Sequence, residues 1–182
     1  VKYIVLNSRV RYHPNLYRNG KVCLSILNTW AGEGWTSCQT IRSILLTLVT
    51  ILNEYPILNE PGVSRIHNDF YKYHSIIKYK NISVAINRML NKSSLHKEFE
   101  CFYETMKSHI NKEKHNILSE IEKMCEYYEN KNFVIHTSIY DMFIEIDLED
   151  YFTYVNNGNT AHGLIFISDE SEETNAYNFA LY

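Results

Sequence analysis

The chain has 182 residues, a formal net charge of -3 and an isoelectric point near 6.3, so it lacks the overall basic field that attracts nucleic acid. With 45% hydrophobic residues it can bury one core with a small appendage, and a second full domain would be a tight fit at this length. The charge is uneven, because residues 131–182 hold nine carboxylates and a single lysine.

The cysteines at positions 23, 38, 101 and 125 stand at least 15 residues apart. This spacing suits neither a disulfide framework nor a CxxC metal site, so we expect reduced thiols, no metal and no cofactor. The chain has no run of 18 apolar residues and no signal-peptide pattern, which predicts an intracellular protein, cytoplasmic or nuclear, without a membrane contact. Its opening on Val1, directly in a strand-like run, is typical of a segment cut from a longer polypeptide.

The first expected elements are extended. Residues 1–6 and 9–12 predict two short strands, and residues 21–27 predict an extended active segment after a tight Asn-Gly turn. This segment has three apolar anchors: Val22, Leu24 and Ile26. Period-two alternation places Cys23 on the opposite, outward face, and a register slip of one residue would reverse that placement.

Helical patterns follow. Thr40 is the predicted N-cap of a helix ending near Leu52, and its largely apolar surface predicts a central position. Further helices are expected over residues 69–91 and, after a cap at Ser93-Ser94, over residues 95–130. The apolar stripe of the last helix is typical of a face packed on a neighbouring helix, rather than of a membrane or cofactor site.

The C-terminal third gives weaker signals. Residues 133–155 mix apolar and acidic side chains and fit a helix or a hairpin equally well. Residues 156–182 predict a solvated tail with a short strand at 164–167.

A cysteine beside a polar turn suggests nucleophilic thiol chemistry, although such a residue is also commonly a packed cysteine. His13 invites a hydrolase-like dyad with Cys23, but it precedes a proline in a turn and lacks an evident third, orienting residue.

The stretch around the cysteine resembles the ubiquitin-conjugating enzyme family. The shared pattern is His13-Pro14-Asn15, seven residues, Cys23, a tryptophan-containing loop, an apolar helix and an acidic residue before Pro61. More narrowly, NLYRNGKVCLSILNTW and NEPG resemble the conjugating domains of very large hybrid conjugating enzyme/ligase proteins. The resemblance is firm over residues 9–62, extends to about residue 130, and lacks the family's first helix and opening strands.

The resemblance implies that Cys23 carries ubiquitin or a relative as a thioester and passes it to a lysine or a ligase. Asn15 would hold the loop after Cys23 or donate to the oxyanion of lysine attack, with His13 and Pro14 as supports. Glu60, with Asn59 beside it, would be the acidic gate for the lysine, unless it is an ordinary solvated carboxylate. Donor ubiquitin would contact three residues of the apolar helix: Leu46, Thr47 and Thr50.

We therefore expect an α+β ubiquitin-conjugating-enzyme fold with a short antiparallel sheet, a central helix and C-terminal helices. Its core would span residues 1–130, and residues 131–182 would form an acidic, partly ordered or disordered extension. The expected partners are ubiquitin, an activating enzyme and a ligase or substrate protein. The alternatives are an inactive ubiquitin-binding or scaffold module of this fold, which needs neither Cys23 nor Asn15, and a cysteine hydrolase using His13.

Overall fold

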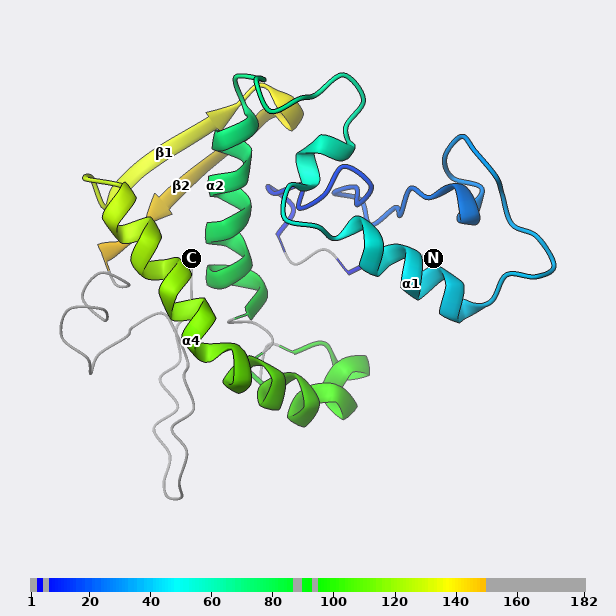
Figure 1. Ribbon diagram of the computed structural model, residues 1–182. Coiled ribbons are helices and arrows are strands. Elements are labelled where there is room, and N and C mark those ends of the chain that lie inside the picture. Colours follow the sequence, from blue (N-terminus) through cyan, green and yellow to red (C-terminus); the bar gives the residue numbers. More distant parts are fainter. Residues whose placement is uncertain (1–2, 5–6, 87–89, 93–94, 150–182) are drawn as a thin grey trace.

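The computed structural model describes residues 3–4, 7–86, 90–92 and 95–149. Its helices and strands are α1 (Ile41–Ile51), α2 (Phe70–Lys80), α4 (Tyr103–Tyr127), β1 (Asn132–Thr137) and β2 (Met142–Asp147). Shorter 3-10 turns occupy Ser25–Leu27, Pro56–Asn59, Lys97–Phe102 and Ile139–Asp141, and a π-helical turn, Asn81–Ile86, continues α2. In Figure 1, α2 stands between the β1–β2 hairpin and the part of the chain that contains α1.

Strands β1 and β2 form the antiparallel sheet of the described chain, in a register that runs from Asn132 opposite Asp147 to Thr137 opposite Met142. Burial alternates along both strands, with Ile135 and Ile144 inward. This pattern confirms an α+β fold with a short antiparallel sheet. Of the two structures that residues 133–155 could form, the described part, up to residue 149, forms the hairpin.

The sequence predicted strands at residues 1–6 and 9–12, but the sheet is formed by β1 and β2. Residues 9–12 form no strand, and the described residues 3–4 of the other expected strand are also irregular; residues 1–2 and 5–6 lie outside the described residues. Val10 is fully buried, while the Tyr73 hydroxyl of α2 donates to the Arg11 carbonyl oxygen at 2.9 Å. The prediction was wrong because this extended backbone is satisfied by a helix side chain rather than by a neighbouring strand.

Helix α1 begins as predicted. The Thr40 side chain accepts from the Ser43 amide and the Ser43 hydroxyl accepts from the Thr40 amide, which makes a complete capping box. The expected central position is wrong, because only one side of α1 packs on the protein, through Ile44 with help from Leu48 and Ile51. The remaining apolar side chains are exposed: Ile41, Leu45, Leu46, Val49 and Leu52.

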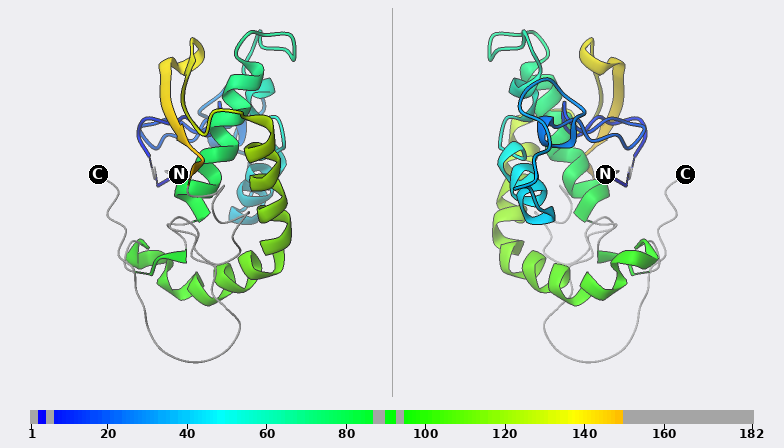
Figure 2. Two further views of the ribbon diagram at one scale, coloured as in Figure 1. Left: turned by 90° about the vertical axis from the view of Figure 1, so that its left-hand side faces the viewer. Right: turned by 90° about the vertical axis from the view of Figure 1, so that its right-hand side faces the viewer.

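The central helix is α2. Tyr73 and Ile76 have no exposed surface and lie in the main core, which α2 shares with α4 and the hairpin. Figure 2 shows α4 running beside α2 and continuing past its end. The two helices are joined by an ion pair of 2.6 Å between Lys78 and Glu120.

The helices expected over residues 69–91 and 95–130 are confirmed in outline, with an irregular start to the second. Ile110, Ile121 and Met124 of its predicted stripe are buried, whereas Phe102 is exposed. Residues 87–89 and the expected cap at Ser93-Ser94 lie outside the described residues.

The main core is continuous across residue 130, where the conjugating core was expected to end. Ile135, Met142, Ile144, Ile146 and Leu148 pack in one cluster with residues of α2 and α4. Residues 132–148 are therefore part of the same packed unit as the preceding chain. The rest of the expected acidic extension, with the strand expected at 164–167, lies outside the described residues.

Among the described helices, none combines the length and the hydropathy needed to span a membrane.

Candidate functional site

The active segment is anchored as the sequence predicted. Val22, Leu24 and Ile26 are buried in a second, smaller cluster with Ile44 of α1. The segment is extended only as far as Leu24, because Ser25–Leu27 turns into a 3-10 helix. This smaller cluster fixes Cys23 between the turn that starts at His13 and the loop that follows residue 27.

Cys23 is buried, with only 2% of its surface exposed, so the predicted outward orientation is wrong. The alternation rule fails because the backbone leaves the extended conformation one residue later and folds back over the thiol. Sγ donates to the Thr29 carbonyl oxygen at 2.9 Å. The Thr29 hydroxyl fixes this arrangement by donating to the Val22 carbonyl oxygen at 2.8 Å and accepting from the Leu24 amide at 2.9 Å.

The loop over the thiol is closed by Asn28. This residue has a left-handed backbone with φ of 55°, and its Oδ1 accepts from the Trp35 amide at 3.0 Å. A side chain at Gly34 would displace the Asn28 side chain, because an added Cβ would overlap Asn28 Oδ1. Trp30 and Trp35 themselves are about half exposed, so the loop residues 28–35 bury little apolar surface around the Thr29 contact with Cys23.

Asn15 binds Cys23 through its backbone carbonyl oxygen and its side-chain amide. The Cys23 amide donates to the Asn15 carbonyl oxygen at 2.8 Å, and Asn15 Nδ2 donates to the Cys23 carbonyl oxygen at 2.7 Å. The side-chain amide thus holds the backbone directly at the cysteine. This is the first of the two roles that the resemblance implied for Asn15.

His13 braces Asn15 and cannot activate the thiol from this position. Nδ1 accepts from the Asn15 amide at 3.0 Å, and Nε2 lies 2.9 Å from the Ile51 carbonyl oxygen, to which the neutral ring donates. Burial, with a smaller contribution from the Arg11 guanidinium, outweighs the Ile51 hydrogen bond and lowers the pKa of His13 to about 4. Since both ring nitrogens are occupied by the backbone, the geometry opposes a hydrolase dyad with Cys23.

Asn59 and Glu60 extend the site away from the cysteine. The Asn59 side-chain nitrogen donates to the Ile51 carbonyl oxygen at 3.5 Å, the same oxygen that accepts from His13 Nε2. Hydrogen bonds therefore lead from Cys23 through Asn15 and His13 to an Ile51 carbonyl oxygen that Asn59 shares. Glu60 is half-buried, and its Oε2 accepts a short hydrogen bond from the Tyr140 hydroxyl. The fold therefore brings together the predicted Cys23, Asn15, His13, Asn59 and Glu60.

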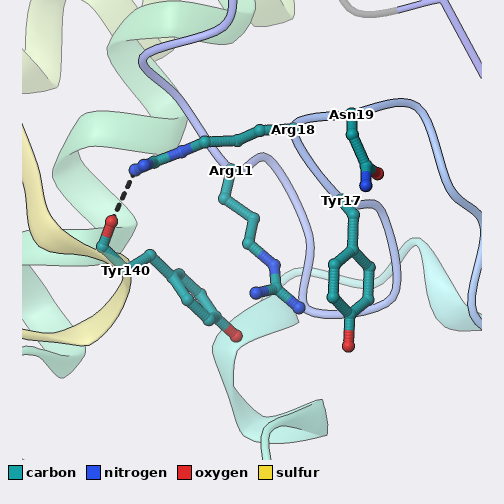
Figure 3. Close-up of a pocket in the computed structure, with 5 residues that line it drawn as sticks. All are labelled: Arg11, Tyr17, Arg18, Asn19 and Tyr140. Carbon is teal, nitrogen blue, oxygen red and sulfur yellow. Dashed lines mark hydrogen bonds between the residues drawn. The ribbon is translucent and has the colours of Figure 1, made fainter.

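Tyr140 belongs to a cluster that the sequence did not predict. Figure 3 shows a pocket whose walls include the Tyr17 and Tyr140 rings with the Arg11 guanidinium between them, 4.0 Å and 4.1 Å from the ring centroids. Arg18 Nη2 donates to the Tyr140 carbonyl oxygen at 2.6 Å. Tyr140 lies in the segment that fitted helix and hairpin equally well, so no pattern in the sequence pointed to it.

Of the remaining predicted residues, Pro14 lies next to His13, and the other three lie on α1. Pro14 is buried, and its carbonyl oxygen accepts from Arg11 Nη2. Leu46 and Thr50 are exposed on α1, and Thr47 is half-buried with its hydroxyl bonded to the Ser43 carbonyl oxygen. In the described part of the chain, no group of three or more His, Cys, Asp or Glu side chains is placed to hold a metal ion.

Comparison with known proteins matches residues 4–82 to the family described as ubiquitin-conjugating enzyme. Ubiquitin-conjugating enzyme E2 Z of Xenopus tropicalis is 44% identical over 86 residues, which are 46% of this chain and 28% of that protein. Probable ubiquitin-conjugating enzyme protein 17 of Caenorhabditis elegans is 32% identical over 134 residues, 68% of this chain and 18% of that protein.

The narrower resemblance is also confirmed. The human dual E2 ubiquitin-conjugating enzyme/E3 ubiquitin-protein ligase BIRC6 is 37% identical over 122 residues, 63% of this chain and 2% of that protein. In each of these three relatives the match spans less than a third of the relative's length. Residues 4–82 of this chain are thus similar to the ubiquitin-conjugating enzyme family.

Proposed function

We propose that the chain carries ubiquitin, or a related modifier, as a thioester on Cys23 and transfers it to a lysine or to a ligase cysteine. The observation that supports this most directly is the set of hydrogen bonds from Cys23 through Asn15 and His13 to the Ile51 carbonyl oxygen, which also accepts from Asn59, beside Glu60. These contacts support a site that combines a thiol, a side-chain amide donor and a carboxylate. The match of residues 4–82 to the ubiquitin-conjugating enzyme family supports the same chemistry.

The first step in this proposal is transthiolation. The Cys23 thiolate attacks the carbonyl carbon of the thioester between the modifier and an activating enzyme. The new C–S bond forms as the activating enzyme's thiolate leaves, so the exchange needs no oxidant and no cofactor. The partners are the modifier, the activating enzyme and a ligase or substrate protein, inside the cell.

The second step is attack by a lysine amine on the Cys23 thioester. Nitrogen bonds to the carbonyl carbon, the carbonyl oxygen becomes an oxyanion, and collapse expels the Cys23 thiolate while nitrogen loses a proton. A lysine amine has a reference pKa of about 10.4 and is mostly protonated at neutral pH. The Glu60 carboxylate is suited to bind the incoming ammonium and to accept the proton that nitrogen loses during attack.

Asn15 serves both states of the site in this mechanism. At rest its amide donates to the Cys23 carbonyl oxygen. A small rotation of this amide would direct its N–H groups at the oxyanion. A comparable donor contributes about 3 kcal/mol in hydrolases.

Charging also requires the loop to move. The Cys23 thiol is covered and bonded to the Thr29 carbonyl oxygen. The 28–35 loop contributes little buried apolar surface, since both tryptophans are about half exposed, so its opening is inexpensive. We propose that loop opening precedes attack by the thiolate.

Donor modifier would rest on the outer face of α1. Leu46 and Thr50 are exposed there, with Thr47 at its edge. The exposed side chains of Leu45 and Val49 add apolar surface to that face. An apolar patch on a modifier could bury this surface while the thioester is attacked.

A non-catalytic binding module of the same fold is the second candidate, and burial of the Cys23 thiol favours it. The two candidates differ in one product. Only the carrier forms a modifier adduct that thiols cleave.

The test is to incubate the full-length protein with activating enzyme, ATP and ubiquitin, and to compare non-reducing with reducing gels. A carrier gives a thiol-sensitive adduct that is lost in Cys23→Ala and kept in Cys38→Ala, which removes an exposed thiol. No adduct from the wild-type protein, with ubiquitin or with a related modifier and its own activating enzyme, would overturn the proposal.

A further inference from the structure

The Glu60 carboxylate is fixed from the far end of the described chain. Its Oε2 accepts from the Tyr140 hydroxyl, 80 residues later in the sequence. Oε1 makes no hydrogen bond to any described residue. One carboxylate oxygen is thus held by the hairpin turn, while the other is left for a ligand.

Tyr140 is itself held rigidly. Its backbone is left-handed, with φ of 63° and ψ of 7°, a conformation that costs a non-glycine residue about 1 kcal/mol or more. Arg18 bonds its carbonyl oxygen, and the amide of the preceding Ile139 donates to the buried carboxylate of Asp69 at 3.0 Å. These contacts hold the turn in a strained shape that directs the Tyr140 ring at Arg11 and its hydroxyl at Glu60.

We propose that Tyr140 is a positioning residue for Glu60, a role that rests on the proposed thioester function. The hydroxyl fixes the side-chain conformation of Glu60 so that Oε1 meets the attacking amine without first being ordered. Ordering a free Glu side chain costs conformational entropy in each turnover, and a fixed one avoids that cost.

The electrostatic surroundings suit this role. Burial, followed by the hydrogen bond to Glu60, raises the pKa of Tyr140, so the hydroxyl remains a donor across the physiological range. The Arg11 guanidinium lies over the Tyr140 ring, and Tyr73 packs edge-on against it at 6.0 Å. Glu60 acts electrostatically on both Tyr140 and Tyr73, and burial keeps the pKa of each tyrosine above its ordinary value.

The experiment compares Tyr140→Phe with Tyr17→Phe in the full-length protein. Both substitutions keep a ring against Arg11, but only the first removes a hydroxyl bonded to Glu60. Cys23 is charged with ubiquitin, and discharge onto free lysine is timed in each variant, in Glu60→Gln, and in the Tyr140→Phe/Glu60→Gln double variant.

We expect Tyr140→Phe to charge normally and to discharge about fivefold more slowly, as for loss of a hydrogen bond to a charged group. Tyr17→Phe should match the wild type. Tyr140→Phe should cause no further loss in the Glu60→Gln background. The defect should shrink as the pH approaches the lysine pKa of about 10.4, where the free amine needs less help.

Each other outcome is decisive. The positioning role is overturned if Glu60→Gln discharges slowly while Tyr140→Phe discharges at the wild-type rate. It is also overturned if Tyr140→Phe slows discharge equally at every pH, or if the effects of the two substitutions add in the double variant. Wild-type discharge of Glu60→Gln removes the gate and the positioning role with it. Absence of any thioester on wild-type Cys23 is the separate failure of the carrier function.

Discussion

Asn15 and Cys23 hold each other through two hydrogen bonds, one from the Cys23 amide to the Asn15 carbonyl oxygen and one from Asn15 Nδ2 to the Cys23 carbonyl oxygen. The pair links two segments that are eight residues apart in sequence. Any change in the Asn15 side chain therefore acts on the shape of the site and, under the proposed mechanism, on its chemistry.

Asn15→Ala should separate these two effects. Loss of the side-chain bond should lower the free energy of unfolding by about 1 kcal/mol. Loss of the oxyanion donor should slow discharge of ubiquitin to free lysine by at least about tenfold while charging continues. Urea denaturation measures the free energy of unfolding, and single-turnover gels measure the rate of discharge. Asn19→Ala, which removes an exposed bond to the Lys21 amide in the same turn, is the control and should discharge normally. Equal discharge rates for both variants would remove the oxyanion role.

The four thiols should differ in reactivity. Cys38 and Cys101 are exposed, whereas Cys23 and Cys125 are buried. With a chromogenic disulfide reagent, we expect Cys23 to react at least about tenfold more slowly than the exposed pair, because the loop must open first.

Asn28→Ala tests the same loop. It removes the bond to the Trp35 amide and replaces a residue that tolerates the left-handed backbone, so Cys23 should react faster while Cys125 is unchanged. The covering loop is refuted as a barrier if wild-type Cys23 already reacts as fast as Cys38.

His13 should make stability depend on pH. Its pKa is lowered to about 4 in the folded protein, against about 6.5 when unfolded, so the unfolded chain takes up the proton first as the pH falls. The contribution of the neutral ring is complete above pH 6.5 and is lost progressively toward pH 4. We expect the free energy of unfolding to drop by about 2 kcal/mol from this residue between pH 7 and pH 5.

Denaturation of wild type and His13→Gln at both pH values measures this contribution by difference. His74, whose pKa burial also lowers, is present in both proteins and cancels. The same pH dependence in the two proteins would contradict the prediction.

The outer face of α1 should matter for discharge more than for folding. Leu46 is 55% exposed, so Leu46→Asp should change the free energy of unfolding by less than about 0.5 kcal/mol. If this face holds the donor modifier, discharge should slow by at least about fivefold, because an apolar contact is lost. Ile66→Asp, at a 93% exposed apolar residue outside α1, is the matched control. Unchanged discharge of Leu46→Asp would place the donor elsewhere.

The sequence predicted the parts of the site that depend on local order. The turn that begins at His13 and the helix cap at Thr40 each depend on residues close in sequence. The structure shows the bond from Asn15 to Cys23 and the capping box at Thr40. The anchors Val22 and Leu24 followed from the same short-range pattern.

What the sequence could not predict depends on contacts between distant segments. An apolar surface around α1 indicated a central helix, but packing uses only the side that carries Ile44. The orientation of Cys23 depends on a loop that returns to it through Thr29, and the Glu60 carboxylate is bound by a tyrosine in a turn that no local pattern specified. Single-sequence periodicity contains none of these pairings.

The position of Tyr140 late in the chain has a consequence for synthesis. A ribosome releases Cys23, Asn15 and Glu60 well before it makes the hairpin that binds Glu60. A nascent or prematurely terminated chain therefore has the thiol and its amide donor without the support for its carboxylate. Under the proposed positioning role, full lysine transfer would therefore require a chain that has been translated through the last described strands.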